Sequence, residues 1–520
     1  MAQLKPGKTV SDQQLLYGLL AVTAISLIVL CYAITQKGVW YDEQWSKWMS
    51  SRELGLVDAA RDRWFHDVHP PFFYLFNWSL SAIVGPDVVA HRWLNFIWLA
   101  ALGGVGSYVA VVRPQRRPAL VVGALLLLSN TDFNKFSEYR SYAIVICATA
   151  AMVLLLQEML ARNRDLELPS DTVLAAMLVI TIGLALNLHY ISTLVCGVTI
   201  GVFALEQLRQ RRRRWAALMI GVSVLAMIPV FWALWAESAY MKDAVPDFWI
   251  KTSAVEAFVI MAGKVVLAGG FNVVVMGCAA FALWQRFRPA TAVSLTDADR
   301  ADWHFAGLAA IAFGLACFLL FAVNLVRPII VPRYLNALTP VAISIIATLA
   351  AGMIVSRRWL HGLFLANAVV VAVWLAWSIQ KKPAWDEGAR LVVAQLRACP
   401  DTMVYSMWRM HGLPAPGRGS LPNEAAFIAW AMADIARGYA IPMRFVEPPA
   451  AGGHLPRADG GCPTLLWMEH AAALDGVRTA QVAGLLASPA DATVLKTVHT
   501  GTGTIIALAS DQRRDVFAGR

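Results

Sequence analysis

Long apolar segments separated by short arginine clusters constrain this chain more than any other feature of its sequence. The first apolar run extends from Leu15 to Ile34, and similar runs recur as far as residue 378. A helix of about 20 residues crosses the hydrocarbon core of a bilayer, so most of these runs can span it. Of the 520 residues, 58% are hydrophobic and only 15% are charged, which a soluble protein could hardly bury. The sequence therefore predicts an α-helical polytopic membrane protein.

The basic residues predict how the helices are oriented. The net charge is +10, and the arginines gather in short loops at 113–117, 209–214, 286–288 and 357–358. Such loops face the cytoplasm, which predicts a cytoplasmic N-terminus, an extracytoplasmic C-terminus and about 11 crossings. The number rises to about 13 if residues 72–84, too short to span alone, belong to a full hairpin. Because flanking spans explain the clusters, we expect no nucleic-acid partner.

The composition changes near residue 380. We predict a transmembrane domain over residues 1–380, with an outer loop at 36–71, and a small extracytoplasmic α/β domain over residues 381–520. Within the second domain, helices are expected from 385, at 423–438 and at 478–486, and strands at 402–408, 464–468 and 504–509. Cys399 and Cys462 each precede a proline and a strand-like run. If those strands are neighbours, a disulfide can form between the cysteines; otherwise both thiols stay free.

Ionisable residues outside the arginine clusters fall in four predicted outer loops. Charge beside membrane-embedded segments is costly to desolvate and therefore marks a functional site. A carboxylate can accept the proton of an attacking hydroxyl, and arginines can hold a departing phosphate. This chemistry suits sugar transfer from a lipid phosphate. The four loops carry Asp42, Glu43, His66, Asp67 and His69; Asp132, Lys135, Glu138 and Arg140; His189 and Tyr190; and Arg333 and Tyr334.

Five short motifs occur in the order seen in GT-C glycosyltransferases. They are Asp42-Glu43, His69-Pro70-Pro71 with the aromatic residues 72–74, Ser137 to Tyr142, His189-Tyr190, and Pro332-Arg333-Tyr334. Each motif alone is weak, but five in register with the topology are a strong signal. Over about residues 10 to 380 the chain resembles the protein mannosyltransferase and aminoarabinose transferase superfamily, in which a C-terminal domain of this kind is common.

The resemblance implies a GT-C fold and an inverting sugar transfer at the outer face of the cytoplasmic (inner) membrane. The implied donor is a polyprenyl-phosphate sugar, and the acceptor is a hydroxyl of an envelope glycolipid, such as lipopolysaccharide, of a polysaccharide or of a protein. No cofactor is certain, and the resemblance leaves open whether a divalent metal ion assists.

The resemblance also assigns roles to single residues. Asp42 is implied as the general base, with Glu43 beside it and Glu138 as a second acid of the outer loops. The implied ligands of the donor phosphate are Arg140, Arg333, Tyr142 and Tyr334. The candidates for an acceptor contact or a metal ligand are His66, His69, His189 and Tyr190, with His69 the first candidate for a metal.

Each assignment has a plainer alternative. Asp42 could cap a helix, and the tryptophans beside it suit an interfacial belt better than sugar platforms. Glu138 and Arg140 could pair with each other, and they share a side only if the helix begins after them. His189 could be an interfacial histidine without a ligand. For the whole chain, a lipid-linked sugar transporter or flippase is the alternative function, and it would be expected to show inverted repeats and broken helices.

Overall fold

The structure is a computed structural model that describes residues 10–67, 69–244, 250–287, 297–379, 384–406, 422–446, 455–456, 458, 462–469, 495–499 and 503–508. The chain divides into two compact units. The larger unit contains residues 1–35, 60–237 and 249–379, and the smaller unit contains residues 36–59, 238–248 and 380–520. The segment that follows the first apolar helix thus belongs to the same unit as residues 380–520.

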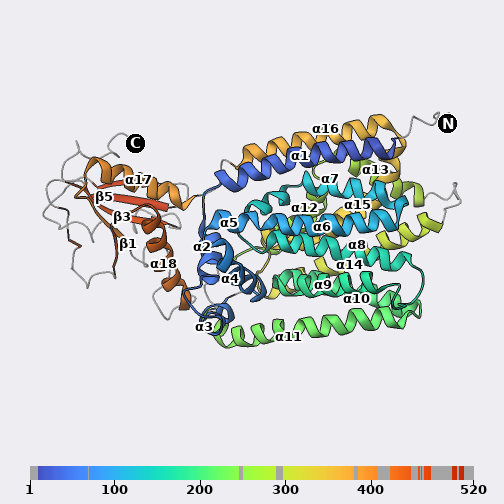
Figure 1. Ribbon diagram of the computed structural model, residues 1–520, viewed down its shortest axis with the longest axis horizontal. Helices are drawn as coiled ribbons and strands as arrows, with labels where there is room; N and C mark the ends of the chain where they lie inside the picture. The colour runs from blue at the N-terminus through green and yellow to red at the C-terminus, as the bar shows by residue number, and fades with distance from the viewer. Residues whose placement is uncertain are drawn as a thin grey trace. The chain divides into compact units, whose positions relative to one another are not determined.

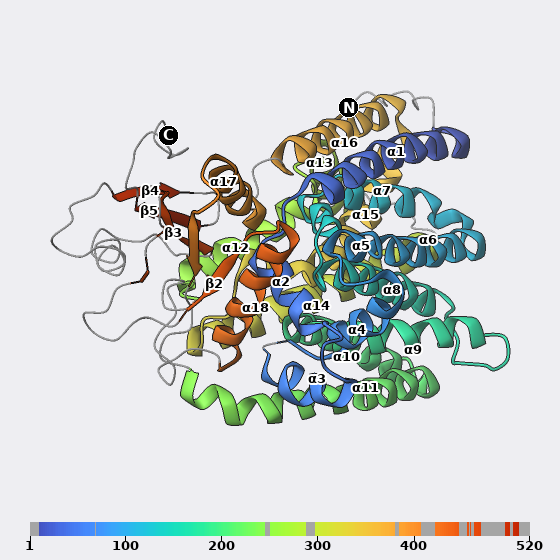
Figure 2. The same cartoon turned by 60° about the vertical axis from the view of Figure 1, so that its left-hand side comes forward.

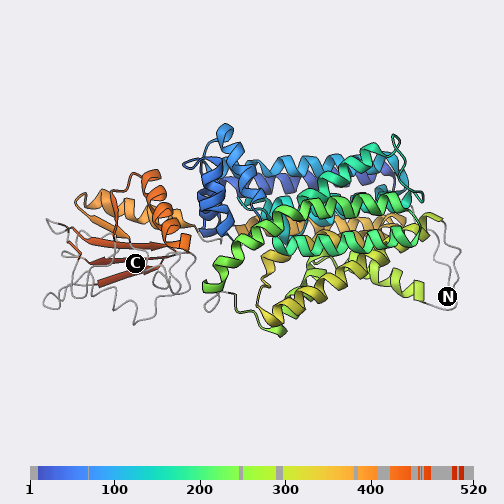
Figure 3. The same ribbon diagram turned by 90° about the horizontal axis from the view of Figure 1, so that it is seen from below.

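The larger unit is helical (Figures 1 and 3). Apart from Gln36 and residues 238–244, which belong to the smaller unit, its α-helices are α1 (Asp12–Gln36), α4 (Phe72–Val84), α5 (Val88–Trp93), α6 (Asn95–Val112), α7 (Arg117–Leu128), α8 (Tyr142–Ala161), α9 (Thr172–Asn187), α10 (Tyr190–Arg209), α11 (Arg213–Ala244), α12 (Ala254–Ala268), α13 (Val273–Phe287), α14 (Asp297–Val326), α15 (Leu338–Ser356) and α16 (Arg358–Ile379). Helix α3 (Leu56–Asp62) lies where the two units meet in the sequence, and 3-10 helices η1 (Trp64–His66), η2 (Pro114–Arg116), η3 (Thr131–Ser137) and η5 (Pro332–Ala337) connect other elements.

Seven helical stretches among the described residues are long and apolar enough to cross a membrane, and the bent pair α12–α13 would make an eighth. Three shorter apolar helices cover residues 72–84, 172–187 and 358–374. The chain is therefore a multi-pass membrane protein, as the sequence predicts. The full count of about 11 to 13 crossings depends on the shorter helices and stays a prediction.

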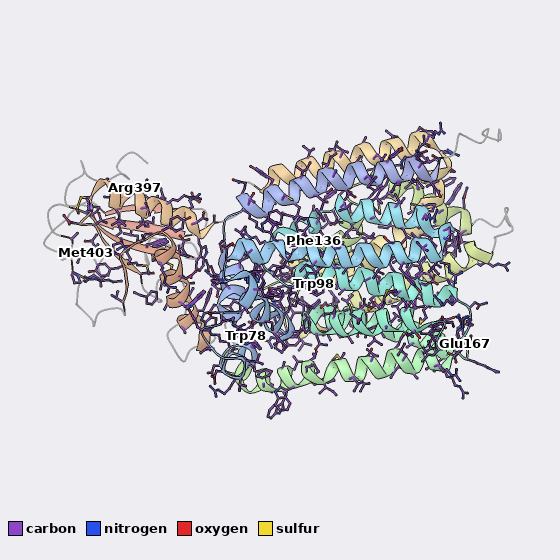
Figure 4. The ribbon with its side chains drawn as sticks, in the orientation of Figure 1. Trp78, Trp98, Phe136, Glu167, Arg397 and Met403 are labelled. Atoms are coloured by element: carbon purple, nitrogen blue, oxygen red, sulfur yellow. A yellow bond between two sulfur atoms is a disulfide. The ribbon has the colours of Figure 1, made fainter. Side chains whose placement is uncertain are left out.

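Helix α8 forms the centre of the larger unit. It contacts α6, α9 and α15 and is buried along 89% of its apolar length, whereas the α5–α6 stretch is buried along only 11%. Small residues such as Ala143, Cys147 and Ala151 allow neighbouring helices to approach α8 closely. Phe136, labelled in Figure 4, lies fully buried in the core beside α8. The apolar faces that remain exposed match those of a protein solvated by lipid.

Two of the long apolar runs are not single straight helices. The segment 118–136 is helical only to Leu128 and continues as the 3-10 helix η3. The segment 256–284 is not one helix, because α12 and α13 meet at an angle of 98°. Gly270 supplies the bend with a φ of +60°, and a side chain there would lie 3.3 Å from the carbonyl oxygen of Ser129. The Asn130 amide donates to the Leu267 carbonyl, and Asn272 Oδ1 accepts from Val275 N at 3.3 Å, so the break keeps its backbone groups bonded.

The smaller unit contains a five-stranded sheet in the order β2-β1-β3-β5-β4 (Figures 1 and 2). The strands are β1 (Met403–Ser406), β2 (Met443–Phe445), β3 (Thr464–Glu469), β4 (Leu495–His499) and β5 (Gly503–Leu508). Strand β1 runs parallel to β2 and β3, and β5 runs antiparallel to β3 and β4. Helix α17 (Trp385–Ala398) packs against β3 and β5, and α18 (Pro422–Gly438) packs against β2.

This architecture confirms the expected strands at 402–408, 464–468 and 504–509 and the helices at 385 and 423–438, and it adds β2 and β4. The helix expected at 478–486 lies outside the described residues. The disulfide between Cys399 and Cys462 is present, with a Cα separation of 5.7 Å. The two cysteines precede the neighbouring strands β1 and β3, whose pairing begins at Met403 and Thr464. The alternative of two free thiols is therefore wrong.

Candidate functional site

The paired acids Asp42 and Glu43 lie in the first turn of α2 (Tyr41–Met49). Trp40 occupies the N-cap position, so the alternative that Asp42 caps this helix is wrong. Both carboxylates are buried: Asp42 is 8% exposed and Glu43 is 0% exposed. Acidic side chains in the first turn of a helix interact favourably with the helix dipole.

The tryptophans beside these acids pack inside the smaller unit. Trp45 and Trp48 contact Phe427 of α18, with ring centroids 4.8 Å and 5.7 Å apart. Tyr41 meets the same Phe427 edge-on at 5.1 Å. Lys47 pairs with Asp434 of α18 at 2.6 Å. Trp45 and Trp48 therefore serve neither as an interfacial belt nor as sugar platforms, because they fix α2 to α18.

A second group of polar residues gathers inside the larger unit. It comes from four separate segments: the loop before α4 and its first turn, the residues at the start of α8, the turn between α9 and α10, and η5. We call it the histidine–arginine cluster, and it consists of Asp67, His69, Tyr74, Arg140, Tyr142, His189, Arg333 and Tyr334.

Aromatic and cationic contacts hold the cluster together. The His69 and His189 rings meet edge to face with centroids 5.0 Å apart, and His189 lies 4.8 Å from the Tyr334 ring. The Arg140 guanidinium carbon lies 5.7 Å from the centre of the Tyr142 ring, and that of Arg333 lies 5.6 Å from the centre of the Tyr334 ring. Four chain segments thus bring two guanidinium groups and two imidazoles together, as the sequence predicts.

Asp67 is the buried anion of the cluster. The sequence places it in a predicted outer loop but assigns it no catalytic or binding role. Its Oδ2 lies 3.0 Å from His69 Nδ1 and accepts a hydrogen bond from the Tyr74 hydroxyl. Burial raises the pKa of Asp67, but His69, the two hydrogen bonds and Arg140 outweigh it and hold this pKa below its usual value. Asp67 is therefore an ionised carboxylate. Its place between two histidines and a proline pair was the signal available in the sequence.

His189 lies at the N-cap of α10, where its Nδ1 accepts a hydrogen bond from the Ile191 backbone at 3.2 Å. Burial, together with His69, Arg140 and Arg333, holds the pKa of His189 well below its usual value. The ring is 5% exposed, and its Nε2 has no hydrogen-bond partner among the described residues. This arrangement differs from an interfacial histidine whose two ring nitrogens are both satisfied.

Glu138 lies next to the cluster in extended backbone, because α8 begins only at Tyr142. That start satisfies the condition for Glu138 and Arg140 to share a side of the chain. Glu138 is fully buried and pairs with Lys135 at 3.1 Å, and Lys135 lies 5.5 Å from the Tyr142 ring. Lys135 therefore adds a third cation to Arg140 and Arg333, next to the Tyr142 ring.

The remaining candidates are less well placed. Tyr190 is the first residue of α10, directly after His189, and the side chain of His66 lies outside the described residues. Among the described residues, no group of three or more histidine, cysteine, aspartate or glutamate side chains could hold a metal ion. The described residues around His69 therefore form no metal-ligand set of this kind.

A buried ion pair lies on the bent helix pair. Lys264 of α12 is 2% exposed, and its ammonium lies 2.8 Å from Asp132 Oδ2. The same oxygen accepts a hydrogen bond from the Thr339 hydroxyl at 2.5 Å. Asp132 was expected in an outer loop, but its partner Lys264 was not expected, because it lies inside an apolar run. The pair joins α12 to η3 and α15.

Comparisons with known proteins agree with this architecture. No family model matches the chain, and no protein of curated function matches it. Among solved structures, ArnT from Cupriavidus metallidurans in the apo state matches with a TM-score of 0.50 and 14% sequence identity, over 94% of this chain and 98% of that one. The chain shares the ArnT fold. ArnT bound to undecaprenyl phosphate matches with a TM-score of 0.49 and 13% identity, over 94% and 97% of the two chains. The predicted GT-C fold, with its small C-terminal sheet domain, is confirmed by the apo match.

Proposed function

We propose that the chain is an inverting membrane glycosyltransferase that moves a sugar from a polyprenyl-phosphate donor to a hydroxyl. The acceptor belongs to an envelope glycolipid, a polysaccharide or a protein at the outer face of the cytoplasmic membrane. The observation that carries the proposal is the histidine–arginine cluster, where Arg140 and Arg333 lie with the buried Nε2 atoms of His69 and His189. Guanidinium and imidazole groups are strong hydrogen-bond donors to a phosphate.

An apolar cavity in the same unit supports a lipid-linked donor. Its volume is about 920 Å³, and α1, α6, α7, α8 and α15 line it. The lining extends along α7 from Arg117 to Leu128 and includes Pro340 of α15. Leu128 lies just before η3, which leads to Arg140. Pro340 lies just after η5, which contains Arg333. An isoprenoid chain in this cavity would therefore lead toward a phosphate held by those cations.

The proposed roles follow the chemistry of displacement at the anomeric carbon. Asp42 accepts the proton of the attacking hydroxyl, with Glu43 next to it in the sequence and Glu138 as a second acid. Arg140 and Arg333 stabilise the negative charge that grows on the departing phosphate. The arginine clusters support a cytoplasmic N-terminus and an extracytoplasmic C-terminal domain for this arrangement.

The test uses purified protein in lipid nanodiscs with a panel of undecaprenyl-phosphate sugars and extracted envelope acceptors. Release of undecaprenyl phosphate and gain of sugar mass on the acceptor are followed by mass spectrometry. Asp42→Asn should lower the rate by about 10²- to 10⁴-fold. Asp58→Asn, a partly exposed acid of α3, is the matched control and should keep the wild-type rate. A wild-type protein that transfers sugar from no donor would refute the function, and an Asp42→Asn variant with more than about a tenth of the rate would remove Asp42 as the base.

The bent pair α12–α13 is the observation that favours the second candidate, a flippase for a lipid-linked sugar. Transporters use the free backbone groups of broken helices to bind substrate. Here side chains such as Asn130 and Asn272 already bond the backbone near the break, which favours a structural role for the bend. Vesicles that contain the protein and a fluorescent lipid-linked sugar, without acceptor, separate the two functions. Movement of the lipid between leaflets without transfer would favour the flippase.

A further inference from the structure

The two histidines of the cluster are held in opposite tautomers by the groups on their Nδ1 atoms. Asp67 is an ionised carboxylate and can only accept a hydrogen bond, so the proton of His69 lies on Nδ1, 3.0 Å from Asp67 Oδ2. Asp67 Oδ2 thus accepts two hydrogen bonds, one from the Tyr74 hydroxyl and one from the Nδ1–H group of His69. A neutral His69 therefore carries a lone pair on Nε2.

His189 has the reverse arrangement. Its Nδ1 accepts the backbone N–H of Ile191 at 3.2 Å and cannot carry a proton in this contact. A neutral His189 therefore carries its proton on Nε2. Both Nε2 atoms are buried and have no hydrogen-bond partner among the described residues, and the two side chains are 6% and 5% exposed. A buried donor or acceptor without a partner is costly, which indicates that a ligand completes both atoms.

The charged and titratable groups around His69 come from every segment of the cluster. They are Asp67 and Tyr74 on its own loop and on α4, His189 at the start of α10, Arg140 before α8, and Arg333 and Tyr334 of η5. Asp67 is the anion in direct contact with His69 and stabilises a protonated ring. His189 has no such carboxylate contact in its described hydrogen bonds. Of the two rings, His69 is thus the one that a carboxylate contacts in the described structure.

We propose that His69, positioned by Asp67 and Tyr74, protonates the departing polyprenyl phosphate, while His189 donates a hydrogen bond to a second oxygen of the same phosphate. The inference rests on the proposed transfer reaction. The bond between the anomeric carbon and the phosphate oxygen breaks, and its electron pair stays on that oxygen. The phosphate changes from a monoanion to a dianion and takes the proton from His69 Nε2, while the hydroxyl proton of the acceptor goes to Asp42. Solvent returns a proton to His69, and Asp42 loses one, before the next turnover.

The first part of the experiment measures tautomers and does not need activity. Protein labelled with ¹⁵N-histidine in nanodiscs is studied by NMR at high pH, where both rings are neutral, and His69→Gln and His189→Gln variants assign the signals. The expected result is a proton on Nδ1 of His69 and on Nε2 of His189. The opposite tautomer at either residue would overturn the proposal.

The second part measures transfer as a function of pH. The wild-type rate should fall at alkaline pH as His69 loses its proton. His69→Gln should lower kcat by about 10²-fold and abolish this alkaline fall. Asp67→Asn should lower kcat, because the carboxylate that orients the His69 ring is gone, and Asp67→Glu should partly restore it.

His91 provides a matched control. It is also buried in the larger unit, but both of its ring nitrogens have partners: Asn77 Oδ1 at 3.0 Å and Ser81 Oγ at 3.1 Å. His91→Gln should affect stability but keep the alkaline fall of the wild type. An alkaline fall that is the same in wild type and His69→Gln would overturn the proton role. Correct tautomers in a protein that transfers no sugar would refute the proposed function, and the proton role with it, but would leave the tautomer pair established.

Discussion

Replacing Lys264 by methionine should destabilise the larger unit strongly, because it leaves the Asp132 carboxylate buried without its cation. The two side chains lie 2.8 Å apart and are 2% and 10% exposed. Removing one member of a buried ion pair costs about 3–5 kcal/mol. The carboxylate keeps the Thr339 hydroxyl at 2.5 Å as a donor, so we expect a cost near the lower end, about 3 kcal/mol.

The double variant Lys264→Met/Asp132→Asn separates charge from shape. The amide that replaces the Asp132 carboxylate can still accept from Thr339, and no charge remains buried, so this variant should recover most of the loss. Stability is measured as the fraction of protein that stays monodisperse in detergent after heating. Lys251→Met, at an exposed lysine just before α12, is the control and should change stability by less than about 0.5 kcal/mol. A double variant no more stable than Lys264→Met would refute the reasoning.

Three further predictions concern other parts of the chain. Arg140→Ala and Arg333→Ala should each lower kcat/KM for the donor by roughly 10- to 100-fold, since a charge-assisted hydrogen bond contributes about 1.5–3 kcal/mol. Unchanged donor kinetics in both variants would move the phosphate site elsewhere. Gly388→Ala should lower the melting temperature measured by circular dichroism despite the better helix propensity of alanine, because the new methyl group would lie 2.2 Å from Glu469 Oε1; an equal or higher value would contradict this close approach. Burial raises the pKa of Asp165, but backbone N–H groups, among them those at the start of α11, outweigh burial and lower this pKa. The contribution of Asp165 to the stability of the protein is therefore complete above the ordinary carboxylate range and is lost as pH falls. The stability gap between wild type and Asp165→Asn, measured by heating in detergent, should therefore shrink from about pH 7 to about pH 4, and a gap that widens would contradict the assignment.

Features set by local sequence were predictable. The end of an apolar run and the following Gly85 mark residues 72–84 as one short helix, and α4 has these bounds. The cysteines before two strand-like runs marked where a disulfide could form, because each strand was recognisable from its own residues, and the pairing of the two strands decided that it does. The loops that supply the histidine–arginine cluster lie together, as expected for loops that the charge pattern predicts on one membrane face.

Features set by distant partners were not predictable. Trp45 and Trp48 have the composition of an interfacial belt, and only Phe427, far along the chain, reveals their packing. Lys264 lies within an apolar run, where the partner that stabilises its charge cannot be deduced from neighbouring residues. The tautomer of His69 depends on the side chain of Asp67 and on the Tyr74 hydroxyl, and their geometry has no sequence signal.

The packing of α2 against α18 has a consequence for the order in which the protein matures during synthesis. Lys47 and Asp434, which pair across these helices, are separated by 387 residues. At about 5–20 residues per second, roughly 20 to 80 s pass between the synthesis of α2 and that of its partner. During this time the aromatic face of α2 has no partner from α18. The helix that carries Asp42 and Glu43 therefore reaches its final packing among the last steps of biogenesis, and a ribosome that stops before α18 leaves a protein whose spans are complete but whose acidic helix is not.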